Sequence, residues 1–427
     1  MSDTHAVEIR VSVDVGCRRH HVAIGLSSGE VLEECEIAHQ PEGFARFFAR
    51  IEAHQKPRGC PVAVAMEGYN GYARPLDRLV LARGYRLYNI NNLKLARFKE
   101  IFPGAAKSDR IDARKGLELF QLRDRLPLAK EVLQEVGSIP KSNEMLKRLT
   151  RRRRRLVNER VRVLNNLQAD LHAVCPGLLE ITGEVGNQWF LHFLVSADTL
   201  IQLTRLRKAT LLKIPAVGRK YASVIQGWQK HAQLSSEVEW VEDMIQDDAQ
   251  RALELDEQIT TLETKMHHAA QESTIATTLV SIPGFGAVCT AELAGEIGTV
   301  DRFRQEGSLA LYLGMATLDN SSGKRQGSKP PKQVNGRAKA AMMTAVDRHR
   351  KSVPKSQQYY EKKRQEGKSH NQAIRALGRH LCRIIYKMLT DERPYEIRAA
   401  EGDTTGRVAS RSLRVGQIRR TEKVAHA

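Results

Sequence analysis

The N-terminal third of the chain shows two periodicities of apolar residues, which together predict a mixed α/β fold. Alternating or continuous apolar runs predict five strands, at 7–15, 20–28, 29–38, 60–68 and 84–91. Apolar residues at helical spacing predict helices at 41–54 and 72–82, and the segment KSDRIDARK begins a further one. Three strands in close succession, followed by helical crossovers, form a mixed sheet with helices on both faces.

The middle of the chain has the apolar pattern of two long helices. Leu149, Leu156 and Val163 repeat at seven residues within 141–172. A second heptad pattern runs through the apolar positions Ile245, Ala252, Leu255, Ile259, Leu262, Met266 and Ala269. Its length predicts a coiled coil, which pairs either with the first long helix of the same chain or between subunits.

Two short turns that contain proline and glycine echo each other 68 residues apart. Ile214-Pro-Ala-Val-Gly218 lies within 175–233, which we interpret as an inserted helical module, and Ile282-Pro-Gly-Phe-Gly286 opens the C-terminal part. Each has the form of a helix–hairpin–helix turn, whose backbone N–H groups can bind a phosphate. We therefore expect phosphate contacts at Gly284 and Gly286, with an ordinary corner between two helices as the alternative.

These patterns divide the chain into four parts. We expect an N-terminal α/β domain at 1–135, a helical and coiled-coil region with its inserted module at 136–274, and a mainly helical C-terminal domain at 275–400. The remainder, 401–427, is basic and poor in apolar residues, which predicts a disordered tail.

Four acidic residues fall where this fold would bring them together. The order of elements in the first domain is that of a ribonuclease-H-like domain, in which the first and fourth strands are neighbours. Asp14 ends the first strand, Glu67 ends the fourth, and Asp109 and Asp112 share one face of the following helix. Such carboxylates suit Mg²⁺ or Mn²⁺, and two ions of this kind can clamp a scissile phosphate. Taken singly, Asp14 and Glu67 could be turn residues and Asp109 a helix cap.

The charge balance indicates a polyanionic partner. With 68 Lys and Arg against 49 Asp and Glu, the 427-residue chain has a formal charge of +19. The first long helix contains the run Arg151, Arg152, Arg153, Arg154 and Arg155, which we expect to contact a nucleic-acid backbone. A solvated helix face is the alternative for this run.

A second basic segment, 320–340, holds six basic residues and no acid, and its Gly, Ser and Pro content predicts a loop. We expect it to bind nucleic-acid backbone through Lys324, Arg325, Lys329, Lys332 and Arg337. Composition alone does not make Ser322, in the same loop, a nucleophile, because a Ser-Ser-Gly-Lys turn is equally suited to simple phosphate binding.

Several protein classes are excluded by what the chain lacks. No apolar signal core and no stretch of 18 apolar residues is found, which argues against secretion and membrane spanning. The six cysteines form no CxxC pair, so neither a zinc ribbon nor a disulfide framework is supported, and a reducing cytoplasm is the expected compartment. No GxxxxGK[ST] motif occurs, which excludes a P-loop ATPase.

Motifs in both halves of the chain resemble the transposases of the insertion-sequence-110 family, including its 1111 subgroup, and the related pilin-gene invertase. The first half matches in VDVG at Asp14, AMEGYNGYARPL at Glu67, and KSDRIDARK at Asp109 and Asp112. The second half matches in SIPGFGAVCTAEL, FRQEGSLALYLGMATL and NSSGKRQGS, so the resemblance covers 7–135 and 275–392. KSD stands where many members have KTD, which leaves the carboxylate in place.

This resemblance implies a RuvC-like domain whose four acids bind Mg²⁺ or Mn²⁺, a coiled coil, and a transposase domain with a catalytic serine. By the Ser-Gly turn that follows YLGM in the family, Ser322 is the nucleophile and Ser321 the fallback. A phosphoserine link would store the energy of the broken DNA bond, so that no ATP is needed. The implied partners are donor and target duplex DNA and a non-coding bridge RNA, on which the protein assembles as a tetramer, a dimer of dimers.

Two other functions are compatible with the same residues. The four acids alone would serve a metal-dependent nuclease or junction resolvase in which water attacks the phosphate. The charge, the coiled coil and the hairpin turn would also serve a non-catalytic nucleic-acid-binding or assembly protein.

Overall fold

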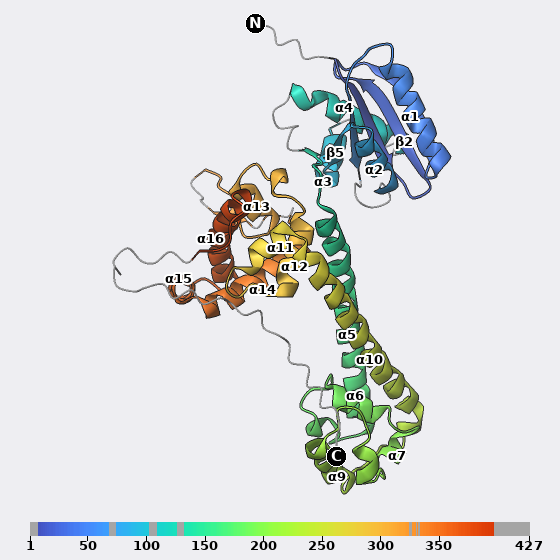
Figure 1. Cartoon of the computed structure of the whole chain (residues 1–427), viewed down its shortest axis with the longest axis vertical. Helices are drawn as coiled ribbons and strands as arrows, with labels where there is room; N and C mark the ends of the chain where they lie inside the picture. The colour runs from blue at the N-terminus through green and yellow to red at the C-terminus, as the bar shows by residue number, and fades with distance from the viewer. Residues whose placement is uncertain are drawn as a thin grey trace.

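The computed structural model is elongated, with a mixed sheet at one end, a small helical module at the other and a long helix pair between them (Figure 1). It describes residues 7–67, 74–101, 109–125, 132–323, 327–329, 331 and 334–396. The C-terminal helices lie beside the helix pair, near the sheet. The tail expected at 401–427 is outside the described residues.

Six strands form the N-terminal sheet in the order β3-β2-β1-β4-β5-β6. From β1 to β6 they span Ile9–Val15, Arg19–Leu26, Val31–Ala38, Val62–Glu67, Arg86–Ile90 and Leu133–Glu135. β4 is parallel to β1 and β5, whereas the other neighbouring strands are antiparallel. The five predicted strands are confirmed, as is the pairing of the first with the fourth. The three-residue β6, at the edge of the sheet, is an addition, because so short a strand shows no alternation.

One face of the sheet is covered by α1 (Pro41–Gln55) and α2 (Arg74–Ala82). Odd-numbered side chains of β1 and even-numbered side chains of β4 point to this face, because side chains alternate along a strand. Together with aromatic residues of α1 they form a hydrophobic core that includes Val11, Val13, Val64, Met66, Phe47 and Phe48.

The opposite face is covered by α4 (Asp109–Gln121), which runs antiparallel to β1. Near the start of β1, Arg10 donates hydrogen bonds to the carbonyl oxygens of Phe120 and Gln121. Further along, α4 approaches so closely that a methyl group at Gly116 would overlap the hydroxyl of Ser12. The first turn of α4 therefore lies at the carboxyl end of β1, and α3 (Asn92–Lys99) packs beside it.

The long helix pair consists of α5 (Lys141–Val174) and α10 (Val238–Gln271), which pack together as an antiparallel coiled coil (Figure 1). Ion pairs join Arg153 to Glu263 and Arg160 to Asp256, so residue numbers fall along α10 as they rise along α5. The predicted heptad positions are buried at Ile245, Ala252, Leu255, Ile259, Met266 and Ala269. Of the two pairings that the heptads allow, the structure has the one within the chain.

The residues between these helices form the distal module, residues 175–233, at the far end of the coiled coil. Its helices are α6 (Gln188–Leu194), α7 (Leu200–Leu203), α8 (Lys208–Leu211) and α9 (Arg219–Gln229). Aromatic side chains fill its core against the ends of α5 and α10, among them Trp189, Phe190, Phe193 and Trp228.

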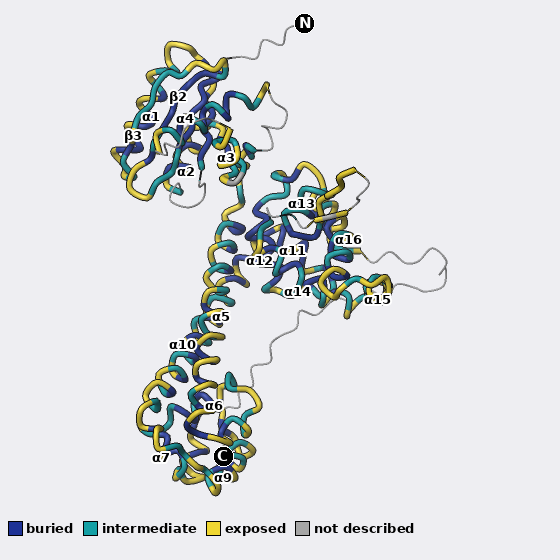
Figure 2. Tube along the Cα trace, turned by 180° about the vertical axis from the view of Figure 1, so that it is seen from behind, coloured by how far each residue is buried: buried dark blue, intermediate teal, exposed yellow. Residues whose placement is uncertain are grey.

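The C-terminal unit, residues 274–396, packs against the near ends of α5 and α10. Its helices are α11 (Thr274–Val280), α12 (Ala287–Ile297), α13 (Glu306–Tyr312), α14 (Gly336–Ser352), α15 (Pro354–Gln365) and α16 (His370–Thr390). A hairpin of two short strands, β7 (Leu318–Asp319) and β8 (Ser328–Lys329), connects α13 to α14. Leu146 of α5 belongs to the same hydrophobic core, which Figure 2 shows as a buried interior between the helices.

The two echoing turns share their backbone geometry. The third residue of each has a positive φ, 63° at Ala216 and 86° at Gly284. The fifth residue of each, Gly218 or Gly286, is the extended N-cap of the next helix. Their surroundings differ, since Ala216 is exposed whereas Gly284 packs on the backbone of His349 in α14. No helix in the described ranges is both long enough and apolar enough to cross a membrane.

Candidate active site

The four predicted acids converge at one end of the N-terminal sheet. Asp14 and Glu67 are direct register partners across the parallel strands β1 and β4. Asp14 lies two residues beyond Ser12 and therefore points to the face that α4 covers, and Glu67 shares that face as its register partner. The first turn of α4, which carries Asp109 and Asp112, lies at the same end of the sheet.

The pKa of Asp14 reflects this crowding of carboxylates. Burial and the negative charges of Glu67 and Asp109, with a smaller contribution from Asp112, raise the pKa of Asp14 to about 6. Lys99 acts in the opposite direction. Mutual repulsion of this kind favours a bound cation, because a positive charge among the carboxylates stabilises their ionised forms.

Lys99, at the end of α3, is the cation that the structure itself places there. Its Nζ lies 3.1 Å from Asp112 Oδ1 and 3.5 Å from Glu67 Oε2. With the side chains arranged in this way, no three His, Cys, Asp or Glu groups of the described residues are close enough to hold one metal ion. The predicted acids are thus assembled by the backbone, but two of them pair with an ammonium group.

The donor atoms of the four acids nevertheless fit a divalent metal. All are carboxylate oxygens, the ligands that Mg²⁺ and Mn²⁺ prefer, and no thiolate is among them. The site lies at the carboxyl end of β1 and β4, close to the start of α5. There Arg74 and Arg78 of α2, the helix after β4, form ion pairs with Glu144.

Two further polar residues continue the row across the sheet and were missed by sequence reasoning. His21 in β2 is the register partner of Asp14, and Glu36 in β3 is the register partner of His21. His21 Nε2 lies 3.5 Å from Glu36 Oε2 and 3.9 Å from Asp109 Oδ2. Alternation puts these side chains on the α4 face, but only the strand register reveals that they adjoin the acids.

Ser322, the predicted nucleophile, is exposed in the loop of the β7–β8 hairpin, as is its fallback Ser321. The N–H of Asn320 donates to the carbonyl oxygen of Gly327 at 2.8 Å, which extends the hairpin toward its loop. Among the described residues, no contact joins Ser322 to any of the four acids. The structure therefore assembles the acids in one unit and presents Ser322 on another.

Three of the five arginines in the run 151–155 form ion pairs within the chain, which the sequence did not predict. Arg151 and Arg154 each form a two-point ion pair, with Glu296 and Glu292 of α12. Arg153 pairs with Glu263, as described above. These three guanidinium groups hold α5 against its neighbours, so contact with a nucleic-acid backbone stays a proposal for the exposed Arg152 and Arg155. The signal for this role lies in the sequence of α12, where Glu292 and Glu296 interrupt an otherwise apolar, small-residue helix.

The remaining predicted contacts lie around the second turn and the basic loop. Gly284 is packed against α14, and the carbonyl oxygen of Pro283 accepts a hydrogen bond from His349 Nδ1 at 2.7 Å. These contacts favour the helix–helix corner for Gly284 and Gly286. Lys329 and Arg337 are exposed, whereas Lys324, Arg325 and Lys332 lie outside the described residues.

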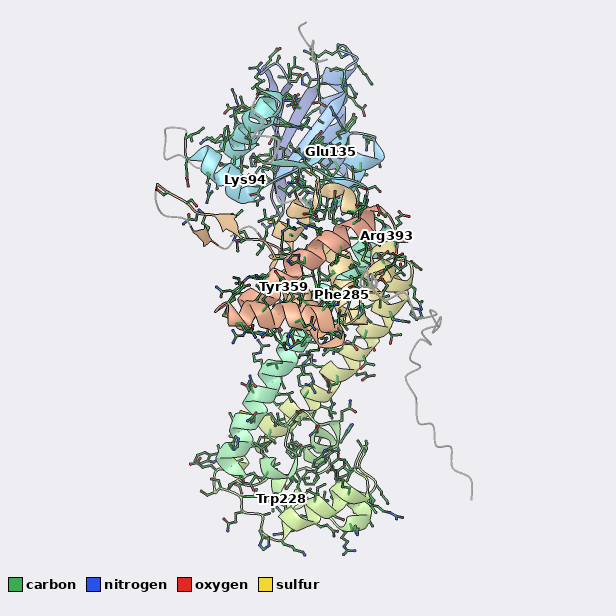
Figure 3. All side chains as sticks on the ribbon, turned by 90° about the vertical axis from the view of Figure 1, so that its left-hand side faces the viewer. Lys94, Glu135, Trp228, Phe285, Tyr359 and Arg393 are labelled. Carbon is green, nitrogen blue, oxygen red and sulfur yellow. The ribbon has the colours of Figure 1, made fainter. Side chains whose placement is uncertain are left out.

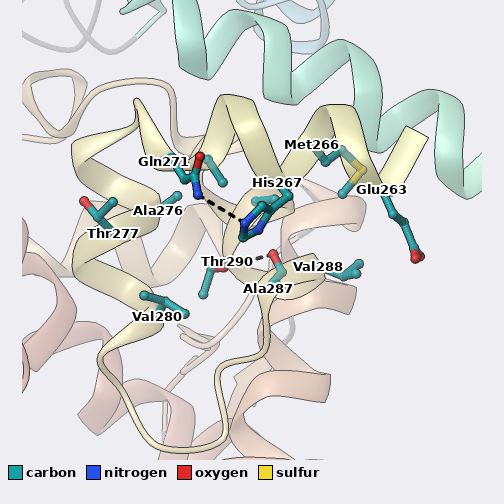
Figure 4. A pocket seen from close by; sticks show the side chains of 12 residues that line it. Glu263, Met266, His267, Gln271, Ala276, Thr277, Val280, Ala287, Val288 and Thr290 are labelled. Atoms are coloured by element: carbon teal, nitrogen blue, oxygen red, sulfur yellow. Dashed lines mark hydrogen bonds between the residues drawn. The ribbon is translucent and has the colours of Figure 1, made fainter. Parts of the chain in front are cut away.

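A cavity of about 250 Å³ between α10, α11 and α12 is a poor candidate for phosphate chemistry (Figure 4). Its walls are mainly apolar and include Met266, Ala276 and Val280. His267 and Gln271 are joined to each other by a hydrogen bond of 3.2 Å, which Figure 4 shows.

Comparison with known proteins places this architecture in a family. A model described as a transposase, of the DEDD IS110 type, matches residues 11–176, and a model of the transposase IS116/IS110/IS902 family matches residues 276–361. The uncharacterized 44.8 kDa protein of insertion element IS116 from Streptomyces clavuligerus is 26% identical over 92% of this chain and 97% of its own length. The uncharacterized 43.6 kDa protein of IS110 from Streptomyces coelicolor is 24% identical over 94% and 99%. A putative transposase, y4uE, from Sinorhizobium fredii is 27% identical over 47% of this chain and 54% of its own length. The chain therefore belongs to the IS110 family of DEDD transposases, the DNA-cleaving and recombining enzymes of insertion sequences.

Proposed function

We propose that this transposase cuts and exchanges DNA strands through metal-assisted attack of Ser322 on a DNA phosphate, guided by a non-coding bridge RNA. The observation that carries the metal-dependent part is the register pairing of Asp14 with Glu67 beneath the first turn of α4. The arrangement of the N-terminal unit supports a RuvC-like domain, in which a central parallel strand pair presents acids to a covering helix.

Each acid would have a distinct position around the bound ions. Asp14 and Glu67 would hold Mg²⁺ from the sheet, and Asp109 and Asp112 would hold it from α4. When bound, the metal supplies charge stabilisation to the phosphate and to the departing oxygen. For this to happen, Lys99 must release Glu67 and Asp112, since its ammonium group occupies the space between them.

Ser322 would supply the nucleophilic oxygen. Its Oγ forms a bond to phosphorus as the bond to one DNA oxygen breaks, the serine proton passes to solvent, and the DNA oxygen leaves as a hydroxyl. The resulting phosphoserine is then attacked by a hydroxyl of the partner duplex, which restores the serine. No bond energy is lost between the two steps, so no nucleoside triphosphate is required.

The separation of Ser322 from the acids supports a composite site. The acids belong to the N-terminal unit and Ser322 to the hairpin of the C-terminal unit. Either the two units close on DNA or two subunits each contribute one part. The family resemblance favours the second arrangement, in a tetramer that holds both duplexes and the bridge RNA.

The experiment that tests the proposal is trapping of a covalent adduct. Wild-type protein with its element-derived RNA and a nicked suicide DNA substrate should yield a protein–DNA adduct that mass spectrometry assigns to Ser322. Ser322→Ala should give no adduct, Ser321→Ala should give the wild-type amount, and Asp14→Asn should give none while still binding DNA. An adduct on Ser321 would correct the position. Strand exchange without any serine adduct would overturn the mechanism.

A junction resolvase in which water attacks remains the second candidate, because the four acids form a complete set without Ser322. It predicts Mg²⁺-dependent nicking by the Ser322→Ala variant at the wild-type rate.

A further inference from the structure

A second candidate site lies in the C-terminal unit, apart from the four acids. This basic cleft has a volume of about 1060 Å³ and is bounded by the β7–β8 hairpin, the start of α14, and the helices α15 and α16. Its cationic lining residues are Lys329, Lys339, Lys363, Lys368, Arg375 and Arg379. No carboxylate is among its described lining residues.

Only part of this positive charge is neutralised by the protein. Lys363 and Lys368 share the carboxylate of Glu366, and Arg379 pairs with Glu306. By contrast, Lys339 and Arg375 form no ion pair with a described residue. In addition, Nη1 of Arg379 is buried and has no hydrogen-bond partner in the described part of the chain. The cleft thus holds unpaired donors that call for an anionic ligand.

The size and composition of the cleft decide what kind of anion fits. Small-molecule sites have volumes of up to about 1,000 Å³ and are mostly apolar. This cleft is at the upper end of that range in volume, and six of its lining residues are cationic. A series of spaced phosphates matches such a lining better than one compact anion does.

The cleft also offers a flat ring surface. Tyr359 and His380 meet edge to face at 4.8 Å, and His380 Nε2 lies 2.9 Å from the hydroxyl of Tyr359, which Figure 3 labels on α15. Burial, with the charges of Arg383, Arg379 and Lys363, lowers the pKa of His380 and so keeps its ring neutral at neutral pH. Aromatic rings beside a cationic groove are typical of sites that bind unpaired nucleic-acid strands.

We propose that the basic cleft binds the sugar–phosphate backbone of a single DNA strand and leads it to the β7–β8 hairpin. Lys329 belongs to that hairpin, whose loop carries Ser322. The delivery of the strand to Ser322 rests on the proposed function, but the binding itself does not.

The test is the salt dependence of binding by the full-length chain. A fluorescein-labelled single-stranded DNA of arbitrary sequence is titrated at several salt concentrations, and log affinity is plotted against log salt. Each lost phosphate contact should lower the slope by about 0.7, so the double variant Lys339→Gln/Arg375→Gln should lower it by about 1.4. Lys363→Gln/Lys368→Gln should act in the same direction and gives a second, independent variant.

The matched control removes two cations elsewhere. Arg46 and Lys56 are exposed on or next to α1, on the outer side of the N-terminal sheet in Figure 1. Arg46→Gln/Lys56→Gln should keep the wild-type slope. An unchanged slope in both cleft variants would overturn the proposal. Displacement of the strand by inorganic phosphate at constant ionic strength, or an effect of the cleft variants on RNA alone, would also overturn it.

The two proposals fail in different ways. If the cleft variants bind DNA normally while an adduct still forms on Ser322, the cleft proposal is wrong and the proposed function stands. If the cleft variants flatten the slope while wild-type protein forms no serine adduct, the cleft proposal stands and the serine mechanism is wrong.

Discussion

Arg151 donates two parallel hydrogen bonds, of 2.7 and 2.9 Å, to the carboxylate of Glu296, which is fully buried. Burial alone would raise the pKa of Glu296, but the hydrogen bonds from Arg151 and Asn335 outweigh it and hold that pKa below its usual value. The pair therefore keeps a charged group inside the protein, where α5 meets α12. An arginine in a run that looks like a nucleic-acid contact thus fixes α5 to a buried carboxylate of the C-terminal unit.

We expect Arg151→Met to destabilise the chain far more than Arg152→Met. Loss of Arg151 leaves the buried Glu296 without its two charged hydrogen bonds, which costs about 2–4 kcal/mol. Arg152 is exposed, and its replacement should change the free energy of unfolding by less than about 0.5 kcal/mol. Urea denaturation followed by circular dichroism measures both. Equal effects would show that the ion pair contributes nothing to stability.

Substitutions at Ala216 and Gly284 should change the stability of the protein in opposite directions. An L-residue with a φ near 60° is strained by about 1 kcal/mol, so Ala216→Gly should stabilise the distal module by about that amount. Gly284→Ala should destabilise the C-terminal unit, because its new methyl group would overlap the backbone of His349. Tryptophan fluorescence reports on the first change, since Trp189 and Trp228 lie in the distal module. A destabilised Ala216→Gly variant would contradict the strain argument.

Acid should weaken the N-terminal sheet through His20. Burial, and to a smaller extent His39, lowers the pKa of His20 from 6.5 to about 4, so the ring is neutral in the folded chain. An unfolded His20 takes up a proton below pH 6.5, and the stability that this residue contributes is therefore full above pH 6.5 and lost as the pH falls toward 4. The slope for one proton is at most about 1.4 kcal/mol per pH unit. Melting curves between pH 7 and 4.5 should show a shallower decline for His20→Gln, and an identical decline would refute the assignment.

Lys99 should compete with divalent metal for the acids. Lys99→Met removes the ammonium group beside Glu67 and Asp112, so Mg²⁺ should raise the melting temperature at lower concentration than in the wild type. Lys99→Arg keeps the charge and serves as the control, with a response close to that of the wild type. If Mg²⁺ shifted none of the three melting temperatures, the acids would not form a metal site in the isolated chain.

Much of the N-terminal site could be predicted because it depends on local patterns. A buried apolar run identifies β4, alternation identifies β1, and parallel neighbours bring their carboxyl ends together, which is why Asp14 and Glu67 were paired correctly. Asp109 and Asp112 follow from helical spacing. Lys99 could not be found in this way, because its contact with Asp112 depends on how α3 packs beside α4. His21 and Glu36 required the register of β2 and β3, which alternation alone does not give.

The arginine run shows the opposite case, in which a strong local signal did not reveal the packing role of three of its residues. Five adjacent arginines project in all directions around α5, so some of them must face neighbouring helices. Which ones do so depends on Glu263, Glu292 and Glu296, more than 100 residues away along the chain. Similarly, heptads predict a coiled coil, but they do not say which helix pairs with α10. Pairing with α5 of the same chain depends on the distal module, which reverses the direction of the chain between the two helices.

The length of the antiparallel helices α5 and α10 determines the position of the distal module. α5 and α10 contain 34 residues each, so at a rise of 1.5 Å per residue the distal module lies about 50 Å from the opposite end of the coiled coil. The start of α5 and the end of α10 lie at the same end of the coiled coil. Removal of one heptad from each helix would therefore bring the distal module closer to that end by about 10 Å and rotate it by only about 20°. On duplex DNA, with 3.4 Å between base pairs, that is a step of about three base pairs. The number of heptads in α5 and α10 therefore sets how far the distal module lies from the C-terminal unit.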